Sequence, residues 1–399
     1  MIWRVGPGVR ARMVVSMKFA SAIVWLVVAG CGRIHFAERA TGDGSIDTPS
    51  GPRFTRITAY GDLTCAEFSG RLYCWGENGS RQLGDGTTMD RGAPTAVSLP
   101  AGALGAFTVG ETHGCAIVDG TLFCWGDTTN TQSFTSPTMI GSPVSDVAAG
   151  KRFTCAVVGT QVKCWGVNDA GQLGDSTLTS RDTLAPIIND QGAVEVDAGD
   201  DHACARTPSN TALCWGHNDD GALGSGSFTP ATTQTPLTVT NGITTLPRIA
   251  GWHACTLRGT EVWCWGRNME GALGDGSVVP KAAPQVVPNF DSASLVATGG
   301  GPTDLDATCA IRMGDLYCWG AGTGGRLGTG APEAVILPTK VGNLPGPVTD
   351  VALGYAHTCA LLADGDIWCW GRGTSGQLGD GKLSNSFTPV RVVPPMTGA

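Results

Sequence analysis

The sequence predicts an all-β fold, a seven-bladed β-propeller with four-stranded blades. Fourteen of the 15 cysteines form seven pairs, and the two cysteines of a pair are always nine or ten residues apart. From one pair to the next, the second cysteine advances by 50, 40, 50, 50, 54 and 51 residues. Each unit holds four short strand-like stretches separated by turns, in a chain with 59 Gly and 23 Pro. Repeats of this length built from four strands are typical of propeller blades rather than of helical solenoids.

The four strands of a blade can be placed in the last unit. Alternating or apolar stretches predict strands at residues 348–354, 357–362, 366–371 and 388–393, with a glycine-rich loop at 376–381. Pro389 at the start of the fourth stretch is compatible with an edge strand. The fourth strand is therefore expected at the outer edge of the blade.

The cysteine spacing predicts the turn between the second and third strands. A spacing of nine leaves a two-residue turn such as Ser69-Gly70 or Asp119-Gly120, and a spacing of ten leaves a three-residue loop at 208–210 or 363–365. The third position of such a loop prefers a left-handed residue, and Asn210 and Gly365 stand there. All seven pairs can then sit directly opposite each other across a hairpin.

These facing cysteines are predicted to form seven disulfides, one in each blade. Counting outward from the turn puts each pair at a non-hydrogen-bonded position, where Cα atoms are about 4.5 Å apart, within the range that disulfides tolerate. Secretion would expose the pairs to an oxidising compartment. The alternative is reduced, packed thiols. The predicted pairs are Cys65–Cys74, Cys115–Cys124, Cys155–Cys164, Cys204–Cys214, Cys255–Cys264, Cys309–Cys318 and Cys359–Cys369.

The N-terminal region predicts a secreted, anchored protein. The apolar run of residues 19–30 is too short to span a bilayer and fits the apolar region of a signal peptide. It ends at Cys31, the one unpaired cysteine, and so resembles a bacterial lipoprotein signal. The resemblance implies cleavage before Cys31 and lipidation of that residue; Gly32 after it favours the outer membrane or cell surface. A plain signal peptide with a chance cysteine is the alternative.

These features divide the chain into three parts. Residues 1–30 are the expected signal peptide, residues 31–53 are the lipidated cysteine with a flexible linker, and residues 54–399 are the propeller. The linker is rich in Gly, Ser, Thr, Asp and Pro and has no periodicity, which is typical of a tether. The expected location is the bacterial cell envelope, with the membrane contacted through the lipid.

Composition narrows the possible partners. Charged residues make up 15% of the chain and hydrophobic residues 42%, which excludes a disordered chain. The formal charge is −8, and nucleic-acid binding needs clustered Lys and Arg, so no nucleic acid is expected as a partner.

The repeated string itself resembles a known family. It reads Cys74-Trp75-Gly76 followed by a Gln-Leu-Gly-Asp-Gly run at 82–86, and it recurs at 164–175 and 369–381. This resembles the regulator of chromosome condensation repeat family over residues 54–394. The resemblance implies a seven-bladed propeller. The family includes a nuclear nucleotide-exchange factor, a plant photoreceptor and secreted bacterial proteins that bind β-lactamases, so it also implies a rigid disc whose face loops bind another protein.

Several polar residues are candidates for chemical sites. His113, His202, His253 and His357 stand two residues before the first cysteine of their units, either as a metal-binding ring or, as we expect, as structural residues capping a backbone group. The strings at 168–171 and 218–221 are similar to calcium loops, but they lack the Glu at position twelve and are better interpreted as turns. No catalytic residue, metal or cofactor is predicted.

Tryptophans are the other candidates. The seven of the Cys-Trp-Gly strings are expected in the core, and so are Trp263 and Trp368. Trp252 lies in a strand-entry loop and is the candidate for an exposed binding anchor.

The sequence therefore predicts an envelope-anchored protein-binding scaffold that uses the loops of a propeller face to bind another protein. One alternative is an inhibitor of an envelope or secreted enzyme. An alternative of a different class is an enzyme or lectin acting on cell-wall or surface glycans. Clustered carboxylates in the central funnel would favour the glycan alternative, and an apolar or aromatic loop face would favour protein binding.

Overall fold

A computed structural model of the chain describes residues 18–19, 22–23, 51–129, 132–301 and 305–395. The chain divides into two compact units, Met1–Ser50 and Gly51–Ala399. In the first unit, β1 (Lys18–Phe19) and β2 (Ala22–Ile23) form an antiparallel pair. The predicted lipidation site Cys31, the rest of the predicted signal peptide and the linker up to residue 50 lie outside the described residues. Among the described residues, no helix has the length and apolar character needed to cross a membrane.

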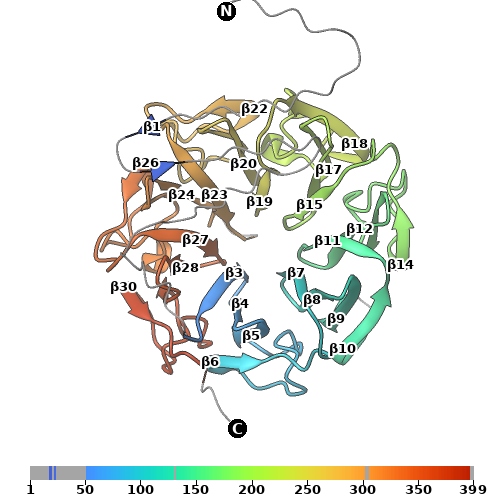
Figure 1. Ribbon diagram of the computed structural model, residues 1–399. Helices are drawn as coiled ribbons and strands as arrows, with labels where there is room; N and C mark the ends of the chain where they lie inside the picture. Colours follow the sequence, from blue (N-terminus) through green and yellow to red (C-terminus); the bar gives the residue numbers. More distant parts are fainter. Residues whose placement is uncertain (1–17, 20–21, 24–50, 130–131, 302–304, 396–399) are drawn as a thin grey trace, which may run out of the picture. The chain divides into compact units, whose positions relative to one another are not determined.

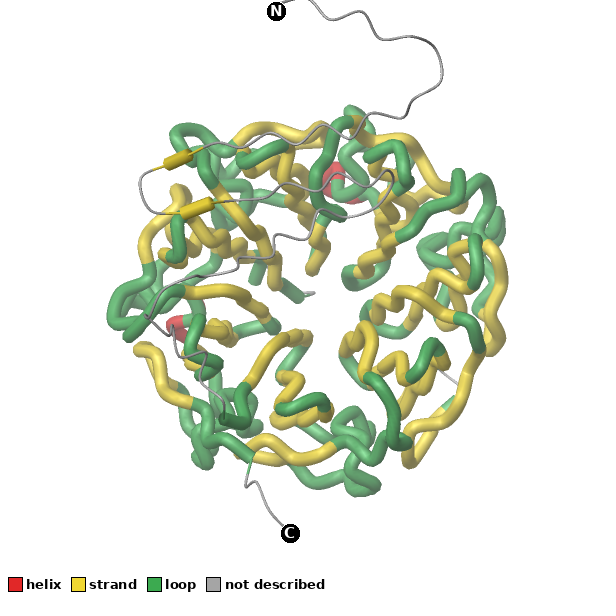
Figure 2. Tube along the Cα trace, in the orientation of Figure 1, coloured by secondary structure: helices red, strands yellow, loops and turns green. Residues whose placement is uncertain are grey.

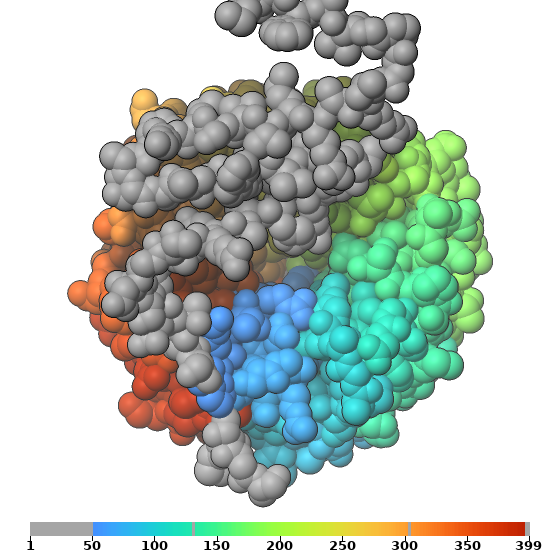
Figure 3. Space-filling view, viewed as in Figure 1, coloured from blue at the N-terminus to red at the C-terminus, as the bar shows by residue number. Residues whose placement is uncertain are grey.

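The second unit is a ring of seven four-stranded antiparallel sheets (Figures 1 and 2). Successive blades occupy successive sectors, so the colours run in order around the ring in Figure 3. The predicted all-β, seven-bladed propeller is confirmed.

The first four blades follow one another along the chain. Their strands are β3 (Phe54–Tyr60), β4 (Leu63–Phe68), β5 (Arg71–Gly76) and β6 (Arg91–Ala96); β7 (Leu104–Val109), β8 (His113–Val118), β9 (Thr121–Asp127) and β10 (Ser133–Gly141); β11 (Val144–Ala149), β12 (Phe153–Val158), β13 (Gln161–Gly166) and β14 (Arg181–Pro186); and β15 (Glu195–Ala198), β16 (His202–Arg206), β17 (Thr211–His217) and β18 (Thr232–Asn241).

Blades 5 to 7 repeat the arrangement. Their strands are β19 (Arg248–Ala250), β20 (His253–Arg258), β21 (Glu261–Gly266) and β22 (Lys281–Val286); β23 (Ala293–Gly299), β24 (Ala307–Arg312), β25 (Asp315–Gly320) and β26 (Val335–Lys340); and β27 (Val348–Leu353), β28 (His357–Leu362), β29 (Ile367–Gly371) and β30 (Ser386–Arg391). Two short 3₁₀ helices, η1 (Asp219–Gly221) and η2 (Thr323–Gly325), lie in the loops of blades 4 and 6.

The hairpin between the second and third strands has the predicted register. Cys155 faces Cys164 across β12 and β13, and Cys204 faces Cys214 across β16 and β17. The turn backbones also agree with the prediction, since Asn210 (φ 60°) and Gly365 (φ 89°) are both left-handed. A hairpin turn that needs positive φ favours Gly or Asn, and this preference allows the position of the turns to be predicted from the sequence.

The outermost strands differ most from expectation. β30 begins at Ser386, two residues before the predicted start, because Ser386 already pairs with Gly371. In blade 2 the outermost strand, β10, is nine residues long and pairs with β9 through two register shifts. Edge strands pair on one side only, so sequence pattern constrains their ends weakly.

The core lies between blades rather than inside them. The tryptophan of each Cys-Trp-Gly string is buried, with at most 1% of its surface exposed. Trp215 of blade 4, for example, joins a cluster with Phe153, Val162 and Leu173 of blade 3. Each blade therefore completes the hydrophobic core of its predecessor.

The ring closes without sharing a strand. β3–β6 form blade 1 and β27–β30 form blade 7, each from one uninterrupted stretch of chain. Blade 7 meets blade 1 through the Phe54 amide, which donates to the Gly365 carbonyl (3.2 Å), and through the Gly381 amide, which donates to the Gly92 carbonyl (2.8 Å).

Candidate functional site

The blades present two faces, which we call the loop face and the hairpin face. The loop face carries the turn between strands 1 and 2 and the long loop between strands 3 and 4, because His253 at the start of β20 lies opposite Gly266 at the end of β21. The hairpin face carries the turn between strands 2 and 3. Any side chain acting in recognition is positioned by the interblade seams, the central channel or these loops.

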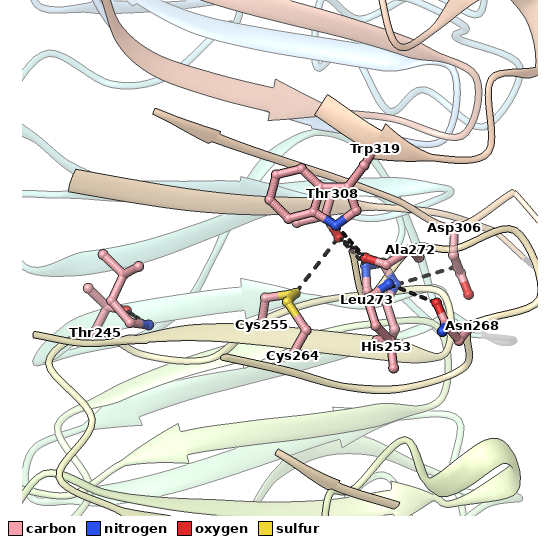
Figure 4. Close-up of a disulfide and its surroundings, with 11 residues drawn as sticks. Thr245, His253, Cys255, Cys264, Asn268, Ala272, Leu273, Asp306, Thr308 and Trp319 are labelled. Carbon is pink, nitrogen blue, oxygen red and sulfur yellow. Dashed lines mark hydrogen bonds and ion pairs between the residues drawn. A yellow bond between two sulfur atoms is a disulfide. The ribbon is translucent and has the colours of Figure 1, made fainter. Parts of the chain in front are cut away.

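Every predicted cysteine pair is brought together. The S–S distances run from 1.99 to 2.13 Å, and the Cα atoms are 4.0 to 4.1 Å apart. All fourteen cysteines are fully buried. In Figure 4, Cys255 and Cys264 of blade 5 lie beside Thr308 of blade 6, whose hydroxyl oxygen is 3.7 Å from the sulfur of Cys255. The bridges therefore lie at the level where neighbouring blades touch.

Among the described residues, a tryptophan–carbonyl hydrogen bond joins blades at six seams. The indole N–H of one blade donates to a loop carbonyl of the blade before it, as Trp319 does to Ala272 (2.8 Å) and Trp75 does to Gln377 (2.9 Å). The glycine after this loop lies against the same indole: a Cβ on Gly274 would lie 2.6 Å from Trp319 Nε1. The repeated Gly-x-Leu-Gly string is therefore the socket for the next blade's tryptophan. The other four bonds are Trp125–Gln82, Trp215–Gln172, Trp265–Ala222 and Trp370–Arg326.

Three of the four repeat histidines bind a side chain of the neighbouring blade rather than a backbone group. His253 Nε2 is 2.9 Å from the Thr308 hydroxyl, and that hydroxyl donates to the Ala272 carbonyl (2.8 Å), so the imidazole is the donor to the hydroxyl (Figure 4). His113–Thr154 and His357–Thr64 repeat the His–Thr contact at 2.7 Å. The expected structural role holds, and the expected backbone partner is wrong.

Burial keeps three of the repeat histidines, His113, His202 and His357, neutral at pH 7. It lowers the pKa of His113 to about 4 and those of His202 and His357 to about 3. His202 differs from the others because both of its ring nitrogens are buried without a hydrogen-bond partner. The residue facing it in blade 5 is Ala254, where Thr stands at the His–Thr seams.

At two other seams a large apolar side chain lies opposite a small residue. Leu63 stands in the histidine position of blade 1 opposite Gly114, and Phe153 of blade 3 stands opposite Ala203. At the seam between blades 6 and 7, the histidine position is Ala307, whose side chain has no hydrogen-bond donor. The buried Arg326 donates there to the carbonyls of Leu305 and of Gly354 (2.9 Å for the latter).

One seam has the geometry of an acid–imidazole–hydroxyl relay. Asp306 Oδ1 lies 3.7 Å from His253 Nδ1, and Thr308 lies on the other side of the imidazole (Figure 4). His253 and Thr308 have no exposed surface, and the Thr308 hydroxyl is engaged with a carbonyl. With no route for a substrate to the hydroxyl, this arrangement braces the seam.

The loops that are similar to calcium loops are turns held by an amide. Asn168 Nδ2 donates to the side chain of Asp175 (3.3 Å), to both oxygens of Thr177 (3.0 and 3.2 Å) and to the carbonyl of Thr179 (3.2 Å). The amide nitrogen thus occupies the centre that a cation would need. Asn78 and Asn268 repeat the pattern. Among the described residues, no group of three or more His, Cys, Asp or Glu is placed to hold a metal ion.

A channel with a volume of about 580 Å³ runs along the first strands of the blades. Carboxylates do line it, namely Asp146, Glu195, Asp197 and Asp350. Three of them accept backbone amides from the first strand of the next blade: Asp146 from Val196 (2.9 Å), Asp197 from Ile249 (3.1 Å) and Asp350 from Ile57 (3.4 Å). Burial raises the pKa of Asp146 to about 6 and raises the pKa of Asp197 and Asp350.

Asp146, Asp197 and Asp350 brace the ring, since each of them joins two blades. Arginines lie beside the carboxylates of the channel. Arg206 pairs with Glu195 at 2.6 Å, and the charge of Arg248 partly opposes the rise in the pKa of Asp197 and Asp350 that burial causes. The sequence criterion for the glycan alternative, clustered carboxylates in the funnel, is met in position, but three of the four carry structural hydrogen bonds.

The channel ends in a cluster that sequence reasoning missed, which we call the hub: Tyr60, Glu111, Asp200 and Tyr355. The Tyr60 hydroxyl of blade 1 donates to Asp200 Oδ1 of blade 4 (2.5 Å), across the ring. The rings of Tyr60 and Tyr355 are 5.5 Å apart, and the Tyr355 hydroxyl donates to Glu111 (3.3 Å). Burial raises the pKa of both tyrosines and raises that of Asp200 to about 7.

Comparison with known families decides what kind of propeller this is. The pattern of the Regulator of chromosome condensation (RCC1) repeat matches residues 69–117, 261–303, 313–361 and 364–398, and a second pattern of the same repeat matches 193–222 and 348–377. Together these ranges cover just over half of the chain. The chain belongs to the RCC1 repeat family.

Two curated relatives share part of this RCC1 region. The human E3 ubiquitin-protein ligase HERC2 is 30% identical over 115 residues, which are 28% of this chain and 2% of that protein. The ultraviolet-B receptor UVR8 of Arabidopsis thaliana is 38% identical over 90 residues, 22% of this chain and 20% of the receptor. The chain thus spans a small part of the first relative and a fifth of the second.

Solved structures of RCC1-like propellers share the fold at low identity. Human WBSCR16 superposes with a TM-score of 0.72 at 19% identity, covering 82% of this chain and 95% of that one. Yeast RCC1 (Prp20), solved bound to Kap60, gives 0.70 at 19% identity and covers 92% of both chains.

Trp252 lies on the loop face of the RCC1 propeller but is partly buried. Its ring packs 5.1 Å from the His217 ring, and the Arg267 guanidinium lies 4.7 Å from its centroid. Its role as a binding anchor stays a prediction. Trp263 and Trp368, expected in the core, are only partly buried, and Trp263 lies under Arg258.

Apolar loop tips are a second feature that no motif signalled. In four RCC1 repeats, an exposed apolar residue stands four positions after the glycine that touches the next blade's tryptophan. These residues are Leu178 (50% exposed), Phe228 (50%), Val278 (52%) and Leu383 (63%). They give the loop face repeated apolar contact points.

Proposed function

We propose that this RCC1-repeat protein is a protein-binding scaffold of the bacterial envelope, anchored by lipid on Cys31, which binds its partner with the loop face. The observation that carries the proposal is the set of exposed apolar tips, Leu178, Phe228, Val278 and Leu383, presented at equivalent positions of a braced ring. Repeated apolar residues exposed on one face are a common feature of protein interaction sites.

Rigidity supports this proposal. A disulfide in each blade and a tryptophan–carbonyl bond at six seams hold the loops before any partner arrives. Preorganised loops lose less conformational entropy on binding, so a given contact area yields more affinity. Protein binding also agrees with the relatives, since yeast RCC1 is bound to Kap60 in its solved structure.

The proposed anchor sets where the partner can be. If residues 32–53 form the flexible linker that their composition predicts, the linker would have a root-mean-square reach of roughly 25 Å. The propeller would then stay close to the membrane. Its partner would be another envelope protein or a secreted protein passing close to the membrane.

Site-specific photo-cross-linking in cells tests the face. A photoreactive residue replacing Phe228 on the loop face is expected to yield one dominant protein adduct. The matched control replaces Met313, which is 79% exposed but lies in the turn between strands 2 and 3 on the hairpin face. Adducts of equal yield from Met313 would contradict the assignment of the face, and no adduct from any loop tip would contradict protein binding.

A second measurement tests the anchor. The Cys31→Ala substitution is expected to move the protein from the membrane fraction to the soluble fraction and to remove the mass of the lipid from the mature N-terminus. If the Cys31→Ala variant stays in the membrane fraction, lipid anchoring is overturned and the binding proposal is untouched.

If the captured partner is an enzyme, its activity with and without the propeller distinguishes an inhibitor from a scaffold. Recovery of wall fragments in place of a protein would favour the glycan alternative.

A further inference from the structure

The hub combines aromatic faces with carboxylates at the end of a channel. Tyr60 lines the channel, and its ring lies 5.5 Å from that of Tyr355. Tyr355 is partly exposed and reaches Glu111, which is also partly exposed. Tyr60 and Asp200 lie deeper, 7% and 1% exposed. The side chains thus run from an open rim to a buried acid.

The buried acid is only half used. Asp200 Oδ1 accepts the Tyr60 hydroxyl at 2.5 Å, whereas Oδ2 is buried with no hydrogen-bond partner in the described structure. The groups whose charge or hydrogen bond acts on it are Tyr60, Asp201, Lys151 and Asp306. A buried carboxylate oxygen without a donor costs stability, and such groups persist in proteins chiefly where a ligand, ion or water completes them.

The channel leads to Tyr60, the hydrogen-bond partner of this acid, and carries surplus negative charge. Its ionisable lining is four carboxylates, Asp146, Glu195, Asp197 and Asp350, against three arginines, Arg56, Arg206 and Arg248. Arg206 forms an ion pair with Glu195, and Arg56 forms an ion pair with Glu67, which lies outside the channel. The field inside the channel therefore favours a positively charged group moving toward Tyr60.

We propose that the hub binds an alkylammonium group, with Asp200 as its counter-ion and Tyr60 and Tyr355 as its aromatic walls. An ammonium carries donors for the free Asp200 oxygen, and its charge is attracted to the faces of tyrosine rings. The inference rests on the proposed function and makes it more specific: the ammonium group would be a lysine side chain of the partner protein. A free amine has the same chemistry.

A bare metal ion fits this site less well. Tyrosine rings offer a divalent cation no lone pair, and the described residues contain no group of three or more acidic, histidine or cysteine side chains placed as ligands. A carboxylate with aromatic walls instead matches a soft, methylene-bearing cation, whose alkyl chain can pass along the threonine and alanine side chains of the channel.

Calorimetric titration of the full-length chain in detergent tests the site with three probes: butylamine, a peptide with one central lysine, and the same peptide with norleucine. We expect saturable, 1:1 binding of butylamine and of the lysine peptide and none of the norleucine peptide. Binding of butylamine alone assigns the site to a free amine, and binding of the lysine peptide assigns it to a partner's side chain. No binding of either up to 10 mM (about 2.7 kcal/mol of affinity) would overturn the proposal.

Two substitutions separate recognition from folding. Asp200→Asn keeps the shape and an acceptor for Tyr60 but removes the charge, and we expect ammonium binding to weaken at least about tenfold, while Asp201→Asn, the adjacent acid, leaves it within about twofold. Near-ultraviolet circular dichroism shows whether each variant is folded. Equal affinity for the wild type and a folded Asp200→Asn protein would overturn the assignment of the counter-ion.

The cross-linking at Phe228 separates this inference from the function. If Asp200→Asn keeps the Phe228 adduct but loses ammonium binding, both proposals stand, with the hub contributing a minor contact. If ammonium binding is absent in the wild type and the adduct is present, only the hub proposal fails.

Discussion

The seam between blades 5 and 6 and the seam between blades 6 and 7 reach the same closure with different chemistry. At the first, His253 donates to Thr308. At the second, the histidine position is Ala307 and the charged Arg326 enters from the loop. Both seams keep the same indole bond, from Trp319 to Ala272 and from Trp370 to Arg326, each at 2.8 Å.

The guanidinium takes the space of the missing imidazole. A Cβ placed on Gly299 of blade 6 would lie 3.0 Å from Arg326 Nη2, and a Cβ on the equivalent Gly354 of blade 7 would lie 2.3 Å from the His357 ring. Burial lowers the pKa of Arg326 to about 10, which still leaves it charged at neutral pH. The comparison teaches that an imidazole or a guanidinium can fill the same volume at a seam, so no particular residue is required.

The largest effect should come from emptying the arginine seam. Arg326→Met removes the donor to the Leu305 and Gly354 carbonyls and leaves Asp306 without its nearby buried cation. Breaking one side of a buried charged network costs about 3–5 kcal/mol. Equilibrium unfolding measures it, with Arg372→Met, a half-exposed arginine, as the control. A loss under about 1 kcal/mol, the size of one net hydrogen bond, would mean that the guanidinium is dispensable.

Acid should weaken the histidine seams and spare the arginine seam. His113, His202 and His357 have folded pKa values of about 3 to 4, below the unfolded value of 6.5. In this range the unfolded chain therefore binds more protons than the folded chain. The free energy of unfolding falls as the pH drops from about 6.5 toward 4. At pH 5 each histidine accounts for about 2 kcal/mol.

His357→Gln tests this pH dependence. The drop in unfolding free energy between pH 7.5 and pH 5 should shrink by about 2 kcal/mol in this variant. Arg326→Met should leave most of the drop in place, because arginine keeps its proton across this range and burial, not the Arg326 charge, is the main cause of the low pKa of His357. An unaltered drop in His357→Gln would show that acid acts elsewhere.

Swapping the chemistry of the arginine seam should restore part of the loss. In the double variant Ala307→His/Arg326→Gln, an imidazole can donate to the Thr358 hydroxyl, as His253 does to Thr308. We expect it to be about 1–2 kcal/mol more stable than Arg326→Gln alone, the range of one or two net hydrogen bonds. Additive effects of the two substitutions would show that the positions are uncoupled.

The smallest effect is a gain. His202 has no partner because Ala254 faces it, so Ala254→Thr should supply the missing hydroxyl and stabilise the protein by about 1 kcal/mol. Thr already occupies this position beside the tryptophan in blades 1, 3, 6 and 7. Ala203→Thr is the matched control, since it faces Phe153 and should destabilise. Thermal unfolding ranks the two, and a loss in Ala254→Thr would contradict the pairing rule.

Sequence reasoning recovered what one repeat contains and missed what passes between repeats. Strand order, turn type and the facing cysteines follow from local spacing, because a hairpin is closed within ten residues. The partner of His113 is Thr154 in the next blade, and aligning units on one another hides such neighbour-to-neighbour matches. Blade 7 shows the same limit at its outer edge, where β30 begins two residues before the predicted start.

The hub lies further still from any local signal. Tyr60 and Asp200 are 140 residues apart and belong to blades 1 and 4, so only closure of the ring brings them together. Neither stands in the repeated string, and the position of Asp200 in the inner turn holds Glu111, Lys151 and Tyr355 in blades 2, 3 and 7. The site is therefore made by the departures from the repeat, which pattern matching is built to ignore.

Because every blade is one unbroken stretch of chain, the joint between the last blade and the first is of the same kind as the other six. Its His357–Thr64 and Trp75–Gln377 contacts repeat those within the ring. A gene for such a ring can gain, lose or reorder whole blades without cutting through a sheet. New termini could likewise be opened at any blade boundary, with the old ends joined, and the same circle should form.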